Sequence, residues 1–152
     1  MMPTRRKTLQ HGAIVAGLLA TTGLFPQFAH AFNAKAFEAK NMGDVLKALG
    51  AGAPVESKDV TITGPDIAEN GAVVPLGAGT ALPGVKQLLI LVEKNPSALI
   101  ATFAITDSID SNILTRAKMG QSSDVYAVAV MNDGKVLFAK KEVKVTLGGC
   151  GG

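Results

Sequence analysis

From Lys58 onward the chain is a succession of short, β-branched apolar segments separated by turn signals, and this pattern constrains the fold most. Val60-Thr61-Ile62-Thr63 alternates as a half-buried strand does, and Asn132-Asp133-Gly134 is a strong hairpin signal. We expect strands over 60–63, 72–76, 87–93, 98–106, 112–119, 125–131, 135–139 and 143–147. Such a series predicts an antiparallel β-sandwich, immunoglobulin-like in class, over residues 51–147.

Details of the pattern refine this prediction. Segments 87–93, 98–106 and 125–131 are apolar on both alternating faces, which is typical of central strands, and we expect a loop over 77–84. Ile113, Ala117 and Met119 are the expected inward residues of 112–119, and Pro75 favours an edge position for 72–76.

The apolar alternation changes parity near the C-terminus. Val136 and Phe138 share one parity, whereas Val143, Val145 and Leu147 share the other. Because a slip of one residue turns an apolar set to the opposite face, we expect a β-bulge near Lys140-Lys141.

Residues 32–50 predict one helix that precedes the sandwich. Phe37, Val45, Leu46 and Leu49 recur at helical spacing, and glycines 50 and 52 end the run. Asn41 or Gly43 could interrupt it.

The first 31 residues have the organisation of an export signal. Arg5 and Arg6 form a twin-arginine start, an apolar run of about 14 residues follows, and Ala29-His30-Ala31 is a small-x-small cleavage pattern. The run is shorter than the roughly 20 residues that a spanning helix needs. We therefore predict export by the twin-arginine pathway, cleavage after Ala31 and a periplasmic product without a membrane anchor; the alternative is an uncleaved N-terminal anchor.

Cleavage would change the composition. Of the 15 basic residues, Arg5, Arg6 and Lys7 would leave, so that 12 remain against 12 acidic ones, and nothing indicates a nucleic-acid partner. Both histidines would leave as well. A chain with no His and one Cys has no Ser-His-Asp triad, Cys-His pair, imidazole metal site or internal disulfide. We therefore expect no enzyme, no cofactor and no metal site.

The chain ends in Gly148-Gly149-Cys150-Gly151-Gly152, which holds its only cysteine. Four glycines make a mobile tether, and a cysteine on such a tether is exposed and reactive. From Leu147, Cys150 can reach roughly 10 Å, and the whole arm roughly 17 Å. The tail offers no cation to lower the thiol pKa from its ordinary value near 8.5, so we expect a partner's active site to activate Cys150.

This ending resembles that of SoxY, the sulfur-carrier family of the bacterial thiosulfate-oxidising Sox system. The residues that carry the resemblance are Val143-Lys144-Val145-Thr146-Leu147 with the five arm residues, supported by the stretch from Pro65 through Ala68-Glu69-Asn70-Gly71 to Val74-Pro75. The resemblance implies that Cys150 is the covalent attachment site and that Gly148, Gly149, Gly151 and Gly152 form a swinging arm.

The resemblance also implies the partners and the bound species. A second β-sandwich subunit, SoxZ-like, would form a heterodimer with the chain. A c-type cytochrome complex would couple thiosulfate to Cys150 as an S-thiosulfonate, a manganese-dependent hydrolase would release sulfate, and a molybdenum sulfur dehydrogenase would oxidise the remaining persulfide sulfur.

Two other functions fit part of the sequence. One is a β-sandwich binding module whose tail thiol is incidental. The other is a ubiquitin-like sulfur carrier, which also ends in Gly-Gly, although the export signal and two-sided strands argue against it. Arg116, the only arginine beyond the signal, is either a contact for an anionic adduct or partner carboxylate, or a surface ion pair of little energetic value.

Overall fold

The computed structural model describes residues 33–146. The predicted export signal, with Arg5, Arg6 and the cleavage site after Ala31, lies outside this range, as do Leu147 and the predicted arm residues Gly148, Gly149, Cys150, Gly151 and Gly152. The described elements are α2 (Ala34–Glu38), α3 (Met42–Ala48), β1 (Pro54–Glu56), β2 (Val60–Thr63), β3 (Ile67–Ala68), β4 (Val74–Thr80), β5 (Val85–Val92), β6 (Leu99–Ala104), β7 (Asn112–Ala117), β8 (Ser123–Met131) and β9 (Val136–Val145).

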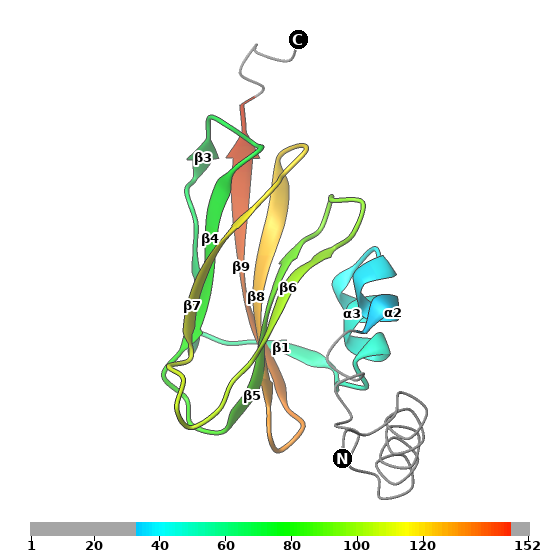
Figure 1. Ribbon diagram of the computed structural model, residues 1–152, viewed down its shortest axis with the longest axis vertical. Coiled ribbons are helices and arrows are strands. Elements are labelled where there is room, and N and C mark those ends of the chain that lie inside the picture. Colours follow the sequence, from blue (N-terminus) through cyan, green and yellow to red (C-terminus); the bar gives the residue numbers. More distant parts are fainter. Residues whose placement is uncertain (1–32, 147–152) are drawn as a thin grey trace, which may run out of the picture. The chain divides into compact units, whose positions relative to one another are not determined.

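The strands form two facing sheets, and the helices lie against the outer face of the larger one (Figure 1). The larger sheet has the order β1-β9-β8-β5-β6, with β3 also paired to β9; the smaller has the order β2-β4-β7. Most pairs are antiparallel, but β1 and β3 each run parallel to β9. The predicted β-sandwich preceded by helical residues is thus confirmed.

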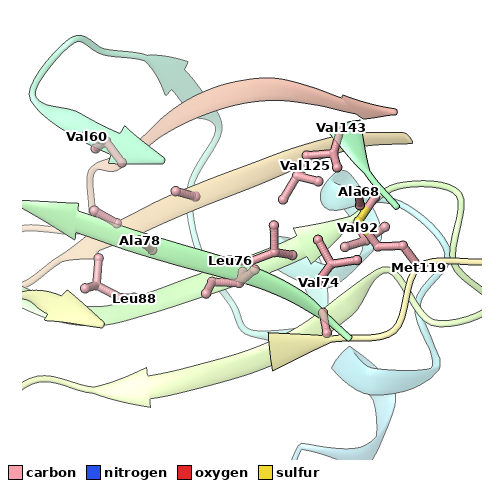
Figure 2. Packing of buried hydrophobic residues seen from close by; sticks show 14 of the residues in the cluster. Val60, Ala68, Val74, Leu76, Ala78, Leu88, Val92, Met119, Val125 and Val143 are labelled. Carbon is pink, nitrogen blue, oxygen red and sulfur yellow. The ribbon is translucent and has the colours of Figure 1, made fainter. Parts of the chain in front are cut away.

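Two apolar clusters explain why several strands are apolar on both faces. One fills the space between the sheets and includes Val74, Leu76, Leu88 and Val125 (Figure 2). The other lies between the helices and the larger sheet, where Val45 and Leu46 pack with Leu89 and other residues of β5, β8 and β9. Because β5 and β8 lie between the two clusters, both of their faces are buried, as the sequence predicts.

The N-terminal segment forms two short helices instead of one continuous helix. Asn41 is extended (φ −147°, ψ 165°), and its side-chain oxygen accepts a hydrogen bond from the Asp44 backbone N–H. This is an N-cap, so a new helix begins after Asn41. Asn33 caps the first helix in the same way by accepting from Ala36 N–H.

The predicted bulge near Lys140-Lys141 is wrong. β8 and β9 keep one register from Ser123↔Val143 to Val130↔Val136 without a break. Val136 and Phe138 face the helices, whereas Val143 faces the other sheet. The parity changes because the helices cover only the first part of β9, so from Lys140 onward this face is exposed.

Two further strand predictions also need correction. Residues 77–80, expected in a loop, continue β4 as the middle strand of the smaller sheet. Its glycines lie where neighbouring side chains need room, since a Cβ on Gly77 would be 2.5 Å from the Leu114 side chain. Pro75 is tolerated because β2 pairs with β4 only from Gly77 onward. Segment 98–106, expected to be central, contains β6 at the end of its sheet.

Candidate functional site: the base of the C-terminal arm

The described chain ends at Thr146, just after β9, so β9 is the base from which the predicted arm continues. One edge of this base is bonded to the β2–β4 connection. The Lys144 N–H donates to the Asp66 carbonyl at 3.0 Å, and the Thr146 N–H donates to the Ala68 carbonyl at 3.0 Å. Figure 1 shows β3 beside the end of β9.

The opposite edge of the base is held by the connection between β7 and β8. The Val145 N–H donates to the Ser122 hydroxyl at 2.9 Å, just beyond the last β8–β9 pair, Ser123↔Val143. The Ser122 hydroxyl thus serves as acceptor where β8 no longer can. Ser123, which is buried, accepts from the Lys94 N–H at 3.0 Å and so links the β5–β6 turn to the same end of the sandwich.

The inner face of the base is packed into the core. Val143 is fully buried, and Figure 2 shows it with Val125, Val92, Ala68 and Met119. Because Val143 is in this cluster and both edges of β9 are bonded, the strand is fixed on three sides.

Gly71 closes the packing beneath the base. A Cβ on this residue would lie 2.4 Å from the Met119 carbonyl oxygen and 2.8 Å from Cγ1 of Val145. The Met119 N–H also donates to the Gly71 carbonyl at 2.7 Å. Only glycine fits this space, which gives a physical role to the Ala68-Glu69-Asn70-Gly71 stretch that carries part of the resemblance.

Lys141 links β9 to the connection between β2 and β3, where the chain passes from the smaller sheet to the larger one. Its ammonium donates to the Gly64 carbonyl at 2.6 Å and lies 2.9 Å from Oδ1 of Asp66. The hydrogen bond from Lys141 and its positive charge lower the pKa of Asp66. Lys141 shares the inward parity of Val143, and its long side chain carries the charge out to the connection.

Arg116 does not lie in the sheet that contains β9, the base of the predicted arm. Arg116 lies on β7 opposite Pro75, in the smaller sheet, and its side chain is exposed. Within residues 33–146 it forms no ion pair. Cys150 and the four arm glycines lie outside the described residues, so their predicted roles remain predictions.

Sequence reasoning missed three residues of the base. The sequence names Gly71 only within the stretch that supports the resemblance, Lys141 was assigned to a bulge, and Ser122 has no sequence signal because its role depends on where β8 begins.

The rest of the described chain has two shallow hollows and no candidate metal site. Residues 33–146 contain no group of three His, Cys, Asp or Glu side chains placed to hold a metal ion. No helix in this range is long and apolar enough to span a membrane. Shallow hollows of about 560 and 570 Å³ lie over the smaller sheet, the first lined by residues including Lys58, Asp59 and Asn112, and the second by Pro75, Leu114, Thr115 and Arg116.

The fold and the base together define a β-sandwich protein whose last strand is anchored at both edges where the C-terminal segment leaves it. The sequence model of one family, described as sulfur oxidation protein SoxY, matches residues 45–150. This match covers more than half of the chain and runs up to Cys150. The chain belongs to the SoxY family.

Solved structures agree with this assignment. The sulfur carrier protein SoxY from Chlorobium limicola f thiosulfatophilum is 30% identical, with a TM-score of 0.62, and the match covers 69% of this chain and 94% of that one. A superoxide reductase (neelaredoxin) from Ignicoccus hospitalis matches at 16% identity and a TM-score of 0.52, over 57% of this chain and 79% of that one, which shows a shared fold alone. Among curated proteins, no sequence match is found. The family and the fold support a carrier role in sulfur oxidation.

Proposed function

We propose that this chain is the periplasmic sulfur-carrier subunit of a thiosulfate-oxidising system, and that Cys150 holds the sulfur intermediates covalently. The observation that carries the proposal is the family match, which extends to Cys150, the only cysteine. The chain is not itself an enzyme in this proposal; it presents its cargo to partner enzymes.

The arm would work because its base does not move with it. The last described residues are bonded to Ala68 on one edge and to Ser122 on the other. An arm of four glycines and one cysteine on such a base can enter a narrow channel in another protein, while the sandwich keeps its place on the partner's surface.

The proposed cycle begins with oxidative coupling. The Cys150 thiol loses its proton, its sulfur bonds to the outer sulfur of thiosulfate, and two electrons pass to a c-type cytochrome complex. Water then attacks the terminal sulfone on a manganese-dependent hydrolase, so that sulfate leaves and a persulfide remains on Cys150. Where a molybdenum sulfur dehydrogenase is present, it removes six electrons from the persulfide sulfur as three water oxygens are added, and a second hydrolysis releases sulfate and the thiol.

Two partner classes follow from the proposal. One is a stable SoxZ-like β-sandwich subunit that would be exported with the chain by the twin-arginine pathway. The other class comprises the enzymes of the cycle. They would bind the arm in turn, and their active sites would activate the Cys150 thiol.

Intact mass spectrometry tests the proposal on protein isolated from cells grown on thiosulfate, before and after mild reduction. We expect sulfur and thiosulfonate increments on the peptide that contains Cys150, lost on reduction, and none in a Cys150→Ser variant. An unmodified thiol under all growth conditions would refute the carrier function and favour a binding module. The N-terminus of the same sample tests export, since any first residue other than Phe32 contradicts cleavage after Ala31.

A further inference from the structure

β6 forms the open edge of the larger sheet. Among residues 33–146 it pairs only with β5, whereas at the other end of this sheet the outer edge of β9 is covered by β1 and β3. Residues 37–40 cover only the start of β6, where the Ala98 N–H donates to the Ala39 carbonyl at 3.0 Å. The edge is therefore open beyond Leu99, from about Ile100 to the end of the strand.

The Leu99 carbonyl accepts from the Ser97 hydroxyl at 3.2 Å, and from Thr102 onward the outward backbone groups of β6 pair with no other strand within residues 33–146. The Ile105 N–H donates to the Lys86 carbonyl on β5, so by antiparallel alternation Phe103 and Ala101 also turn their backbone groups to β5. Thr102 and Ala104 then direct theirs away from the sheet. In the same part of the chain, the buried hydroxyl of Thr102 also lacks a hydrogen-bond partner.

This edge lacks the charged and proline residues that most often protect exposed strands, and its register shift lies near its start, between the pairs Ile90↔Ala101 and Leu91↔Leu99. Residues 97–106, Ser-Ala-Leu-Ile-Ala-Thr-Phe-Ala-Ile-Thr, contain no charge and no proline. Natural sheets usually place Lys, Pro or a bulge on an open edge, because an apolar, uncharged edge recruits other strands. The edge strand β7 differs, since it carries Arg116.

Apolar side chains beside this edge are only partly covered. Ile100, Phe103 and Ile105 pack against the inter-sheet cluster from the β6 side, and Ile113 does so from β7, yet all four remain partly accessible. A strand added next to β6 would pair its outward backbone groups and cover these side chains.

The chain's own C-terminal segment cannot supply this strand. Residues 147–152 continue from β9, which is separated from β6 by β8 and β5, or about 14 Å at the usual strand spacing. Six residues span at most about 20 Å, so after crossing the sheet about two residues would remain to pair with a strand of six.

We infer that β6 is a docking edge to which a second β-sheet protein adds an uncharged edge strand, so that the larger sheet continues across the interface. The occupant must be an extended chain because only backbone N–H and C=O groups can complete the ladder, and it must be uncharged because it would lie against residues 97–106. This inference rests on the proposed function only in naming that protein as the SoxZ-like subunit.

Hydrogen exchange, followed amide by amide, tests the inference with the full chain and the SoxZ-like subunit of the same organism. We expect the amides of Thr102 and Ala104 to exchange at least about tenfold more slowly in the complex. Amides of Ala101 and Phe103, already bonded to β5, should change much less.

A variant pair tests the same edge by affinity. Ala104→Lys places a charge on the edge and should weaken the complex by about tenfold or more, whereas Ala53→Lys, at an exposed alanine away from β6, should change it less than about twofold. The melting temperature of each isolated variant shows whether it folds, and the exchange measurement on the unaltered chain needs no variant.

Three results would overturn the inference. One is a complex that protects the outer face of the smaller sheet around Leu114 but not Thr102 and Ala104. Another is self-association that protects those amides without the second subunit. The last is no binding of the subunit at all; sulfur increments on Cys150 in the same preparation would then show that the carrier function survives and only the docking edge fails.

Discussion

The Lys141 ammonium lies 2.9 Å from the Asp66 carboxylate and 2.6 Å from the Gly64 carbonyl, and so fastens the crossing between the two sheets to the strand that leads to the arm. The carboxylate is 89% exposed, so the ion pair itself adds little stability. The hydrogen bond from Lys141 to the Gly64 carbonyl is partly buried, and it accounts for most of the stability that Lys141 adds.

Lys141→Met should remove this attachment while keeping most of the side-chain volume. We expect the free energy of unfolding to fall by about 1 kcal/mol, the typical net value of one hydrogen bond. Lys140→Met is the matched control, because within residues 33–146 Lys140 forms only a long, partly exposed pair with Asp124 at 3.5 Å. Urea denaturation of both variants measures the difference, and equal losses would contradict the role of Lys141.

The same contact predicts a response to acid. Since Lys141 lowers the folded pKa of Asp66, this pair stabilises the fold above the ordinary Asp pKa, and the stabilisation is lost as pH falls through the lowered value. Asp66→Asn should therefore flatten the pH dependence of stability below about pH 4 relative to the unaltered chain. Parallel curves for the two proteins would show that the ion pair does not form in solution.

Gly71→Ala should disturb the base of the arm. Its new methyl group would lie 2.4 Å from the Met119 carbonyl oxygen, so backbone must shift, at a cost of about 1–3 kcal/mol. Gly120→Ala is the control, since a Cβ there meets nothing within 4 Å. Thermal unfolding compares the two; a Gly71→Ala protein as stable as the control would mean that the packing around Met119 is looser than described.

Ser122→Ala should loosen the end of β9 without unfolding the sandwich. The variant loses the hydroxyl acceptor 2.9 Å from the Val145 N–H, so this amide should exchange about tenfold faster, while Val143 one pair further in stays protected. Ser108→Ala, at an exposed serine in the β6–β7 connection, should leave both amides unchanged.

Tyr126 should ionise well above its ordinary pH. Burial raises its pKa to about 12, and its hydrogen bond to the Glu93 carboxylate at 3.1 Å contributes further. Because the folded pKa exceeds the unfolded value near 10, the neutral phenol stabilises the fold below pH 10, and this contribution is lost as pH rises through 12. As the chain has one Tyr and no Trp, phenolate absorbance reports this group alone. Glu93→Gln should lower the titration midpoint only in part, since burial remains.

Gly149→Val should slow sulfur transfer while leaving the fold intact. A β-branched residue stiffens and widens the predicted arm, which lies beyond the described residues. Turnover with the partner enzymes and the melting temperature are measured together. Unchanged turnover would argue against a narrow channel, and a lowered melting temperature would show that Gly149 belongs to the fold.

Much of the sandwich could be predicted from local patterns. Two-sided segments such as 125–131 identified the strands buried between two layers, and Asn132-Asp133-Gly134 located a hairpin, because both signals depend on neighbours in the sequence. Errors arose where a distant element decides the outcome. The parity change in β9 was attributed to a bulge because nothing in the sequence says that the helices stop covering the strand after Phe138.

The candidate site likewise contains some residues that the sequence identifies and others that it does not. Cys150 and its glycines were apparent from the sequence because composition alone distinguishes them. The residues that hold the base were not, since Gly71, Ser122 and Lys141 act across 23 to 77 positions of sequence or through a space that only folding creates. The segment 77–80 read as a loop because its glycines are commonest in turns, whereas here they make room for the adjoining strands.

β9 is hydrogen-bonded along both of its edges, and this arrangement also has a mechanical consequence. An edge strand pulled from its end peels, breaking one hydrogen bond after another, each under the full load. A pull along β9 is instead shared at once by the ladder to β8 on one side and the contacts with β3 on the other, and the side chain of Val143 resists sliding. A partner that grips the C-terminal segment and later lets it go would therefore exert its force on the segment and leave the sandwich intact from one turnover to the next.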